Sequence, residues 1–288
     1  MVISILAGGL GNQLFQYSFG FRLACQLQTP LRLERHLLDS RLLARVRQYT
    51  ARQYELDVFG IEQREASLAD TLGGLGKALI PGFSAIFLRE NAQTSLDVIT
   101  PNISDVVCLG YWQSDSYFQP VSAALRNQLI FRKPVSEQTR RIADSIRAHS
   151  NATFVHIRRG DYVSNATANQ HHGVCDVSYY RQAVKSLRDQ VANAHLFVFS
   201  DDQAWVRQEL ANVLGSATFI DHNKTTDSWQ DMYLMSLCRH GIVANSSFSW
   251  WGAWLNGETN RIVIAPKQWF ANQPIANERI TPTYWHRL

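Results

Sequence analysis

The second half of the chain alternates short apolar runs with longer amphipathic stretches. The apolar runs predict strands over residues 153–158, 195–199, 217–220, 241–244 and 261–265. Apolar positions with a helical period predict helices over residues 178–191, 203–213, 227–240 and 248–256. Strands that alternate with helices are typical of a parallel sheet covered by helices, so this half is predicted to be a doubly wound α/β unit.

The first half has a less regular pattern. Residues 2–7 predict a strand that runs into a glycine turn, and residues 13–28 show a helical period. Between residues 30 and 110 we expect several short helices, with a turn at Gly73, Gly74 and Gly76. The segment 131–136 is a predicted hinge, so we expect two halves, residues 1–135 and 136–288.

Composition narrows the classes of partner. The chain is 45% hydrophobic and 18% charged, which is ordinary for a globular protein. Its net charge of +4 is not gathered into a basic stripe, so we expect no nucleic-acid partner. The four cysteines are far apart and have no zinc-site spacing, so we expect reduced thiols and no metal site: Cys25, Cys108, Cys175 and Cys238.

The hydropathy pattern predicts no membrane anchor. The first residues lack a basic region and a cleavage site, and no apolar run approaches the ~20 residues that span a bilayer. We therefore expect a cytoplasmic protein. Residues 79–88 are the most apolar stretch between predicted elements. We expect them to form a buried loop or short helix, and the alternative is peripheral contact with a membrane or a lipid.

A glycine-rich motif, Gly8-Gly9-Leu10-Gly11-Asn12-Gln13, follows the first predicted strand and opens a helix. Glycines allow the backbone to approach a ligand closely, and the amides at a helix N-terminus favour an anion. The motif differs from the dinucleotide-binding fingerprint, because Leu14 stands at the third glycine position. A tight strand-to-helix turn without a ligand is the alternative.

A charged motif, His156-Ile157-Arg158-Arg159-Gly160-Asp161, ends the strand predicted over residues 153–158. Strand alternation puts His156 and Arg158 on one face. Ligands of α/β sheets bind at the carboxyl ends of strands, and arginines offer planar donors to phosphate oxygens. We therefore favour an anion site, with a surface salt-bridge cluster around Asp161 as the alternative.

The next predicted strand ends in Ser200-Asp201-Asp202. Two adjacent carboxylates could ligate a divalent ion, but they do not form a D-x-D triplet. The favoured interpretation is a cap for the helix predicted to start at Gln203.

Asp231 shares one face of an apolar helix with Leu234, Met235 and Cys238. A carboxylate on an inward face needs hydrogen-bond donors. The N1–H and amino group of a guanine would supply them, and so would a buried donor of the protein; the pattern leaves both open.

The last motif joins small polar residues to a tryptophan-rich helix, from Asn245 to Trp254. Ser246 or Ser247 can cap this helix, and its free amides and dipole would stabilise a leaving diphosphate. The tryptophans are interpreted as core residues rather than as sugar-stacking platforms.

Taken together, the segments GGLGNQLFQY, HIRRGDY, FSDD and NSSFSWWGAWL resemble the α-1,2-fucosyltransferase family, glycosyltransferase family 11. The arginine motif is shared more widely with α-1,6- and protein O-fucosyltransferases. The resemblance covers the whole chain. It implies a GT-B-like fold of two Rossmann-like halves facing a cleft, with the donor in residues 136–288 and the acceptor in 1–135. The implied reaction is inverting transfer of L-fucose from GDP-β-L-fucose to the 2-hydroxyl of a terminal galactose, for a surface polysaccharide or another glycan.

The resemblance also implies roles for the motif residues. Arg158 would grip the β-phosphate, His156 and Asp231 would hold the guanine, and Ser246 and Ser247 would meet the diphosphate. The turn that would close over the diphosphate contains Gly8, Gly9, Gly11 and Asn12. The residues that would line the donor pocket are Arg159, Asp161, Asp201 and Asp202.

Members of this family generally need no metal, so no metal or cofactor is expected. Asp161 is a candidate for the base that deprotonates the acceptor, and His171, His172 and Asp176 are further candidates. Two alternatives remain: a fucosyltransferase of another linkage, α-1,6 or protein O-linked, and a nucleotide-sugar binding protein without turnover. The resemblance fits a bacterial cytoplasmic enzyme, and peripheral contact with the inner membrane stays an expectation.

Overall fold

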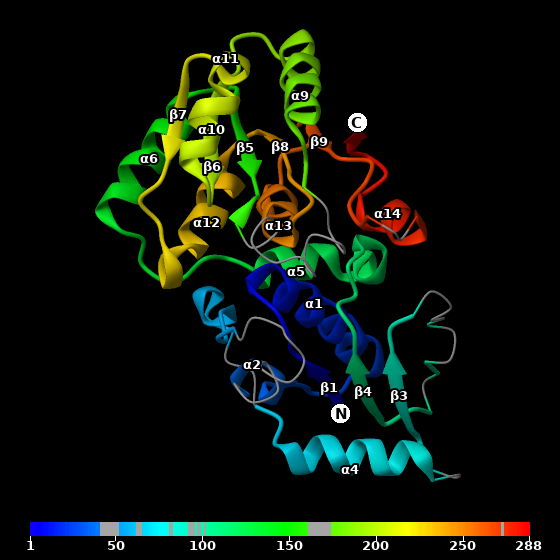
Figure 1. Cartoon of the computed structure of the whole chain (residues 1–288). Helices are drawn as coiled ribbons and strands as arrows, with labels where there is room; N and C mark the ends of the chain where they lie inside the picture. Colours follow the sequence, from blue (N-terminus) through cyan, green and yellow to red (C-terminus); the bar gives the residue numbers. More distant parts are fainter. Residues whose placement is uncertain are drawn as a thin grey trace. The chain divides into compact units, whose positions relative to one another are not determined.

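The computed structural model describes residues 1–40, 52–61, 65–80, 83–91, 96, 99–100, 102–160, 174–271 and 274–288. The chain divides into two compact units, Met1–Lys133 and Pro134–Leu288. Each unit contains one parallel sheet with its own helices, and each is described by itself (Figure 1).

The first unit is built on a four-stranded sheet in the order β2-β1-β4-β3, in which all the neighbouring strands are parallel. Its strands are β1 (Val2–Ile5), β2 (Leu31–Glu34), β3 (Ala85–Arg89) and β4 (Asp105–Leu109). Its helices are α1 (Leu10–Leu27), α2 (His36–Asp39), η1 (Leu56–Phe59), α4 (Leu68–Leu79), η2 (Asp115–Tyr117), η3 (Gln119–Val121) and α5 (Ser122–Gln128).

Helix α1 begins inside the glycine motif, three residues before its predicted start. Gly9 is the N-cap, and its carbonyl accepts from the amides of Asn12 at 2.9 Å and Gln13 at 3.1 Å. Gly8 takes φ +79°, in the left-handed region that favours glycine. A Cβ on Gly8 would also lie 2.5 Å from the Asn12 side-chain nitrogen. The motif is therefore the first turn of α1 and its approach.

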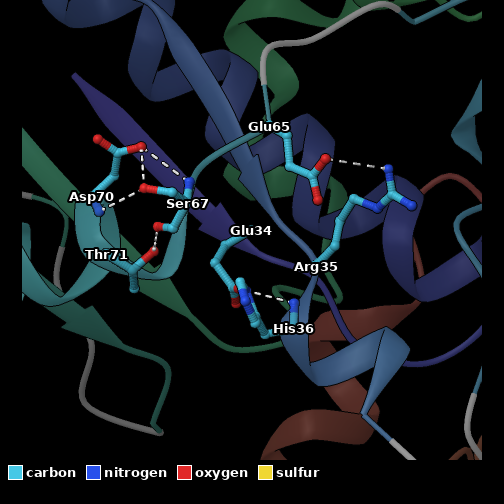
Figure 2. Close-up of polar contacts among 7 residues, drawn as sticks. All are labelled: Glu34, Arg35, His36, Glu65, Ser67, Asp70 and Thr71. Carbon is cyan, nitrogen blue, oxygen red and sulfur yellow. Dashed lines mark hydrogen bonds and ion pairs between the residues drawn. The ribbon is translucent and has the colours of Figure 1, made fainter.

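The glycines at 73–76 do not form the predicted turn, because they lie inside α4. Figure 2 shows the start of this helix, where Ser67 and Asp70 form a capping box: the Ser67 hydroxyl accepts from the Asp70 amide, and the Asp70 carboxylate accepts from the Ser67 amide. A Cβ on Gly74 would lie 2.8 Å from Val107, so this glycine lets the helix pack closely on the sheet. Capping and packing outweigh the low helix propensity of glycine.

The prediction of burial for residues 79–88 is wrong for most of the described positions. Leu79 is 84% exposed at the end of α4, and Ile80, Phe83 and Phe87 are also exposed. Leu68 and Leu72, on the same helix, are exposed as well. Among the described residues, no helix is long and apolar enough to span a bilayer.

The second unit is built on a six-stranded parallel sheet in the order β10-β9-β8-β5-β6-β7. Its strands are β5 (Ala152–Ile157), β6 (His195–Ser200), β7 (Ala217–Ile220), β8 (His240–Ile242), β9 (Val263–Ala265) and β10 (His286–Arg287). Its helices are α6 (Glu137–Ala148), α9 (Val177–Gln190), α10 (Gln203–Glu209), α11 (Ala211–Leu214), η4 (Thr225–Asp227), α12 (Trp229–Leu237), α13 (Ser247–Leu255) and α14 (Pro274–Ile280).

The residues of β5 alternate between two buried layers. Val155 and Ile157 pack with α9, α10 and α11 in one apolar cluster. On the other side of the strand, the His156 ring lies 6.0 Å from that of Phe248 in α13, measured between centroids. The strand is buried throughout, as expected for a parallel sheet covered on both faces. His156 therefore lies in the layer that contains the tryptophan-rich helix.

Two predicted helices of this unit have different bounds in the structure. The helix predicted over 203–213 is broken at Leu210, a fully buried residue with φ −115° and ψ 0° that ends α10 and precedes α11. The helix predicted to reach His240 ends at Leu237. The Asn256 side chain binds the Cys238 carbonyl at 2.6 Å, and His240 starts β8. Tertiary contacts thus determine where α10 and α12 end.

Candidate functional site

The candidate site of the second unit lies where β5 and β8 run side by side. From β5 the chain continues outward to β6 and β7, and from β8 it continues to β9 and β10 in the opposite direction. The boundary between β5 and β8 is therefore the switch point of the sheet. Ligands of doubly wound folds bind outside the carboxyl ends of the strands at such a point.

His156, in β5, is buried, with 6% of its surface exposed. Its Nδ1 atom has no hydrogen-bond partner among the described residues. Burial lowers the pKa of His156 to about 3, although the nearby Asp201 carboxylate acts to raise it. The imidazole is therefore neutral at physiological pH. A buried polar atom without a partner is uncommon in a folded protein. It suits a hydrogen bond to a ligand.

Arg158 comes directly after β5 and pairs with Asp201, which comes directly after β6. The Arg158 Nη1 atom lies 2.7 Å from the Asp201 carboxylate, and about a quarter of each side chain is exposed. The other Asp201 oxygen accepts from the Arg159 amide at 2.9 Å. A Cβ on Gly160 would lie 2.6 Å from Asp201, so only glycine leaves room for this carboxylate. The guanidinium is thus held at the end of its strand.

Arg159 has a different environment from Arg158. Its guanidinium carbon lies 3.8 Å from the centroid of the Trp205 ring, and its Nε lies 3.4 Å from Asp202. Asp202 caps α10, because its carboxylate accepts from the Trp205 amide at 3.1 Å. The structure therefore shows the capping interaction that the sequence favoured, and it packs the Arg159 side chain against α10.

Helix α13 begins at the carboxyl end of β8. Ser246 is its N-cap, and the Ser246 hydroxyl accepts from the Phe248 amide at 3.3 Å. Ser247 is partly exposed, and its amide and hydroxyl have no hydrogen-bond partner within the described part of the chain. The side chain of Asn245 binds the Trp269 carbonyl at 3.3 Å and so fixes the approach to the helix. The first turn of α13 can therefore receive an anion.

The tryptophans of α13 are core residues, as predicted. Trp250, Trp251 and Trp254 are each at most 2% exposed, and the indole of Trp250 donates to the Ile280 carbonyl at 2.8 Å. A Cβ on Gly252 would lie 2.8 Å from Met235 of α12, so the two helices pack closely. This packing holds the N-terminus of α13 in place.

Asp231 lies in the first turn of α12. Its carboxylate accepts from the Asn223 side chain at 2.7 Å. Burial raises the pKa of Asp231 to about 7, and the hydrogen bond from Asn223 opposes that shift. Asn223 is bound in turn by Thr139 at 3.2 Å. The donor partner that the sequence required is thus a protein amide, and a ligand contact of Asp231 stays a prediction.

The glycine motif lies in the first unit, at the carboxyl end of β1. Asn12 accepts from the Gln113 side chain at 2.8 Å. The Glu55 carboxylate lies close to this end of α1: a Cβ on Gly9 would lie 3.8 Å from its Oε2 atom, and the Leu10 amide lowers the pKa of Glu55 against the larger effect of burial, which raises it. The predicted contacts of Gly8, Gly9, Gly11 and Asn12 with a diphosphate remain predictions.

The structure gathers some of the predicted site residues and not others. His156, Arg158 and Asp201 lie together at the ends of β5 and β6, with Ser246 and Ser247 at the end of the neighbouring β8. Asp161, His171 and His172 lie outside the described residues. Asp176 accepts from the Tyr179 amide at 2.8 Å and caps α9.

Two residues of interest lay outside the sequence-based set. Gln13 was visible as the last residue of the glycine motif, and its fully buried amide binds the segment that contains Glu55. Glu55 itself had no signal, since it stands in a stretch without a clear period. No cluster of three or more metal-ligating side chains occurs within the described ranges.

The two parallel sheets and their strand ends define the class of protein. The chain has the α/β architecture of GT-B-like proteins, with two Rossmann-like halves. It is similar in fold to a solved structure of an Arabidopsis thaliana FUT1 mutant in complex with GDP, with 11% identity and a TM-score of 0.52 over 92% of this chain and 70% of that chain.

Sequence comparisons give the family. The model for glycosyl transferase family 11 matches residues 87–288. An Escherichia coli alpha-1,2-colitosyltransferase is 31% identical over 296 residues, covering 100% of this chain and 99% of the relative. The human galactoside alpha-(1,2)-fucosyltransferase 1 is 25% identical over 154 residues, covering 51% of this chain and 42% of the relative. The chain belongs to glycosyl transferase family 11, and it is a glycosyltransferase.

Proposed function

We propose that this glycosyltransferase moves L-fucose from GDP-β-L-fucose to the 2-hydroxyl of a terminal galactose, with inversion to an α-1,2 linkage, in a surface polysaccharide or another glycan. The observation that carries the proposal is the position of Arg158 and the N-terminus of α13 at the ends of neighbouring strands, β5 and β8. The human relative, named for α-1,2-fucosyl transfer to galactosides, supports the choice of sugar and linkage.

The leaving group would be stabilised by Arg158 and by α13. When the acceptor oxygen attacks C1 of the donor sugar, the bond from C1 to the phosphate oxygen breaks and negative charge grows on GDP. A guanidinium has five N–H donors, so Arg158 can bind phosphate oxygens while it holds Asp201. The Ser247 amide would donate a further hydrogen bond to the phosphate oxygens, and the dipole of α13 would stabilise the same negative charge on GDP. Such preorganised donors stabilise the transition state more than the bound donor.

The guanine would be held by His156 and Asp231. The unpartnered Nδ1 of the neutral His156 suits a hydrogen bond to the nucleotide. The Asp231 carboxylate would accept from the guanine N1–H and amino group beside its bond from Asn223, because a carboxylate has several acceptor sites. We also propose that the unit Pro134–Leu288 binds the donor and that Met1–Lys133 receives the acceptor, with no metal or cofactor in the reaction.

The test is transfer to a panel of β-galactosides, lactose among them, with GDP-fucose as donor and the linkage determined by NMR. We expect an α-1,2-fucosylated product and unchanged turnover in EDTA. Arg158→Ala is expected to lower turnover by about 10²–10³-fold while the protein stays folded, with Arg207→Ala as the exposed control. An α-1,6 or protein-linked product, or GDP-fucose binding without GDP release, would contradict the proposal.

The similarity to a colitosyltransferase over the whole chain favours a second candidate for the donor sugar. Colitose is fucose without its 3-hydroxyl, so both sugars present the same reacting carbon. The two candidates are separated by assaying GDP-fucose and GDP-colitose in parallel with one acceptor. A higher kcat/KM with GDP-colitose would replace fucose by colitose and leave the roles of Arg158 and α13 unchanged.

A further inference from the structure

The pairing of β5 with β8 ends just before the two groups that the proposed function assigns to the diphosphate. The last paired residues are Val155 in β5 and Ile242 in β8. Arg158 follows shortly after the first of these residues, and Ser247 follows shortly after the second. Beyond the last pair, strand pairing no longer determines the distance between the two segments. Other contacts must therefore fix the position of Arg158 relative to the start of α13.

Two adjacent tyrosines of α9 bind the next residue of each segment. The Tyr180 hydroxyl donates to the carbonyl of His156 at 3.2 Å. The Tyr179 hydroxyl donates to the carbonyl of Val243 at 2.7 Å, and it also lies 3.2 Å from the carbonyl oxygen of Ile264 in β9. The first turn of one helix thus contacts the ends of β5, β8 and β9.

The two tyrosines are themselves held in fixed positions. Asp176 caps α9 and accepts from the Tyr179 amide at 2.8 Å. The rings of Tyr179 and Tyr180 pack edge to face, with 5.0 Å between their centroids, and both side chains are buried. Burial raises the pKa of both tyrosines well above its ordinary value, so both hydroxyls stay protonated and can donate.

The residue before the cap of α9 makes a further contact with the approach to α13. The Cys175 Sγ atom lies 3.5 Å from the side-chain oxygen of Asn245, whose amide nitrogen donates to the Trp269 carbonyl at 3.3 Å. Asn245 directly precedes Ser246, the N-cap of α13. The start of α9 therefore contacts both the end of β5 and the approach to α13.

The spacing of these two segments matters for the proposed chemistry. Arg158 and the Ser247 amide must reach the oxygens of one diphosphate, and a displacement of about 1 Å can cost about 10²-fold in rate. A buried carbonyl that loses its donor is left with an unsatisfied acceptor, which favours a shift of the backbone. The carbonyls that accept from Tyr179 and Tyr180 belong to the same segments as Ser247 and Arg158.

We propose that Tyr179 and Tyr180 are positioning residues of the diphosphate site, which hold the end of β5 that carries Arg158 against the start of α13 that carries Ser247. The two hydroxyls act through the backbone of these segments and not through contact with the nucleotide. This inference rests on the proposed function, since it assumes that a diphosphate binds at these strand ends. It does not depend on which sugar is transferred.

The first test removes only the hydroxyls, in Tyr179→Phe and Tyr180→Phe. The control is Tyr233→Phe, because the Tyr233 hydroxyl accepts from Arg147 at 3.0 Å at an exposed site. We expect each α9 variant to weaken GDP binding by about tenfold, measured by calorimetry, and to lower kcat by about 10–10²-fold. Tyr233→Phe should keep the parent values. Thermal unfolding checks that each variant is folded.

Double-mutant cycles separate positioning from a general contribution to stability. Tyr180 acts through Arg158, so Tyr180→Phe should weaken GDP binding by less than about twofold once Arg158 is replaced by alanine. Tyr179 acts through the start of α13, so Tyr179→Phe should have a smaller effect on GDP binding in Ser247→Ala than in the parent. The effect of Tyr179→Phe should not vanish there, because the backbone amide of residue 247 remains.

Parent-like GDP affinity and kcat in both phenylalanine variants would overturn the proposal. So would an equal loss of GDP affinity from Tyr180→Phe in the parent and in Arg158→Ala, which is the result for a hydroxyl that only stabilises the core. A parent that binds GDP but transfers neither fucose nor colitose refutes the proposed function, while the cycles still decide the role of the tyrosines. A parent that does not bind GDP refutes both.

Discussion

Arg158 and Asp201 face each other from the ends of two adjacent strands, β5 and β6, with 2.7 Å between Nη1 and the carboxylate. Asp201 also accepts from the Arg159 amide, so it fixes both the side chain and the backbone at the end of β5. We interpret Asp201 as the residue that orients Arg158 and not as a metal ligand.

Replacing Asp201 by asparagine should therefore reduce turnover without abolishing donor binding. Misplacement of a reacting or stabilising group by about 1 Å can cost about 10²-fold in rate. We expect a loss of up to that size in kcat for Asp201→Asn, measured by GDP release. The control is Asp221→Asn, which removes the exposed pair of Asp221 with Arg207. An equal loss in both variants would argue against an orienting role.

The two serines at the start of α13 should differ in what they contribute. Ser246 caps the helix, so Ser246→Ala should cost about 1 kcal/mol of unfolding free energy and lower Tm by about 2–4 °C. Ser247 makes no such cap, so Ser247→Ala should leave Tm nearly unchanged. Its hydroxyl is expected to contact the diphosphate, and its loss should weaken GDP binding by about tenfold. Calorimetry and thermal unfolding of both variants measure the split.

Asp231 predicts a pH dependence of stability. Its pKa is about 7 in the folded protein and near 3.8 when unperturbed. A raised pKa means that the folded state favours the protonated form, so stability is full below pH 3.8 and is lost as the pH rises through 7. Asp231→Asn, which resembles the protonated form, should gain in Tm relative to the parent across that window. Thermal unfolding from pH 4 to 8 tests this, and a constant difference would contradict it.

The same group predicts a pH dependence of nucleotide binding. Only the ionised Asp231 can accept from both the guanine N1–H and the amino group. The parent should therefore bind GDP more tightly as the pH rises towards 7. Below pH 7 the affinity should increase by up to about tenfold for each pH unit. Asp231→Asn should bind weakly and lack this component, so the ratio of the two affinities isolates it from titration of the phosphate. His156 is neutral throughout this range.

The strands of the second unit could be predicted from the sequence because each is a short apolar run between helices. The predicted strands over 153–158, 195–199 and 217–220 match β5, β6 and β7 to within a residue. Strand β10, with two exposed residues, and the first-unit strands β2 to β4 were not recognised. A strand of four or five residues in a mixed segment leaves too few positions to show a period.

The parts of the candidate site that could be predicted from the sequence are those in which neighbouring residues lie at the end of a single strand. Strand alternation put His156 on the face opposite Val155 and Ile157, and the polar residues after β8 marked the start of α13. Pairings between distant segments were not predictable. Gln13 and Glu55 are 42 residues apart, and so are Arg159 and Asp201. Their contacts depend on how strands are ordered in each sheet, and no local pattern contains that information.

The pairing of β5 with β8 has a consequence for folding. These strands are neighbours in space, but β6, β7 and α12 lie between them in the chain. Contacts of such long sequence separation form slowly. A nascent chain that ends before β8 already contains Arg158, but it lacks both the partner strand of β5 on that side and the helix end that would complete the proposed nucleotide pocket. Affinity for GDP would therefore appear only once the chain has been made through residue 255, and ligand binding reports the last stage of assembly.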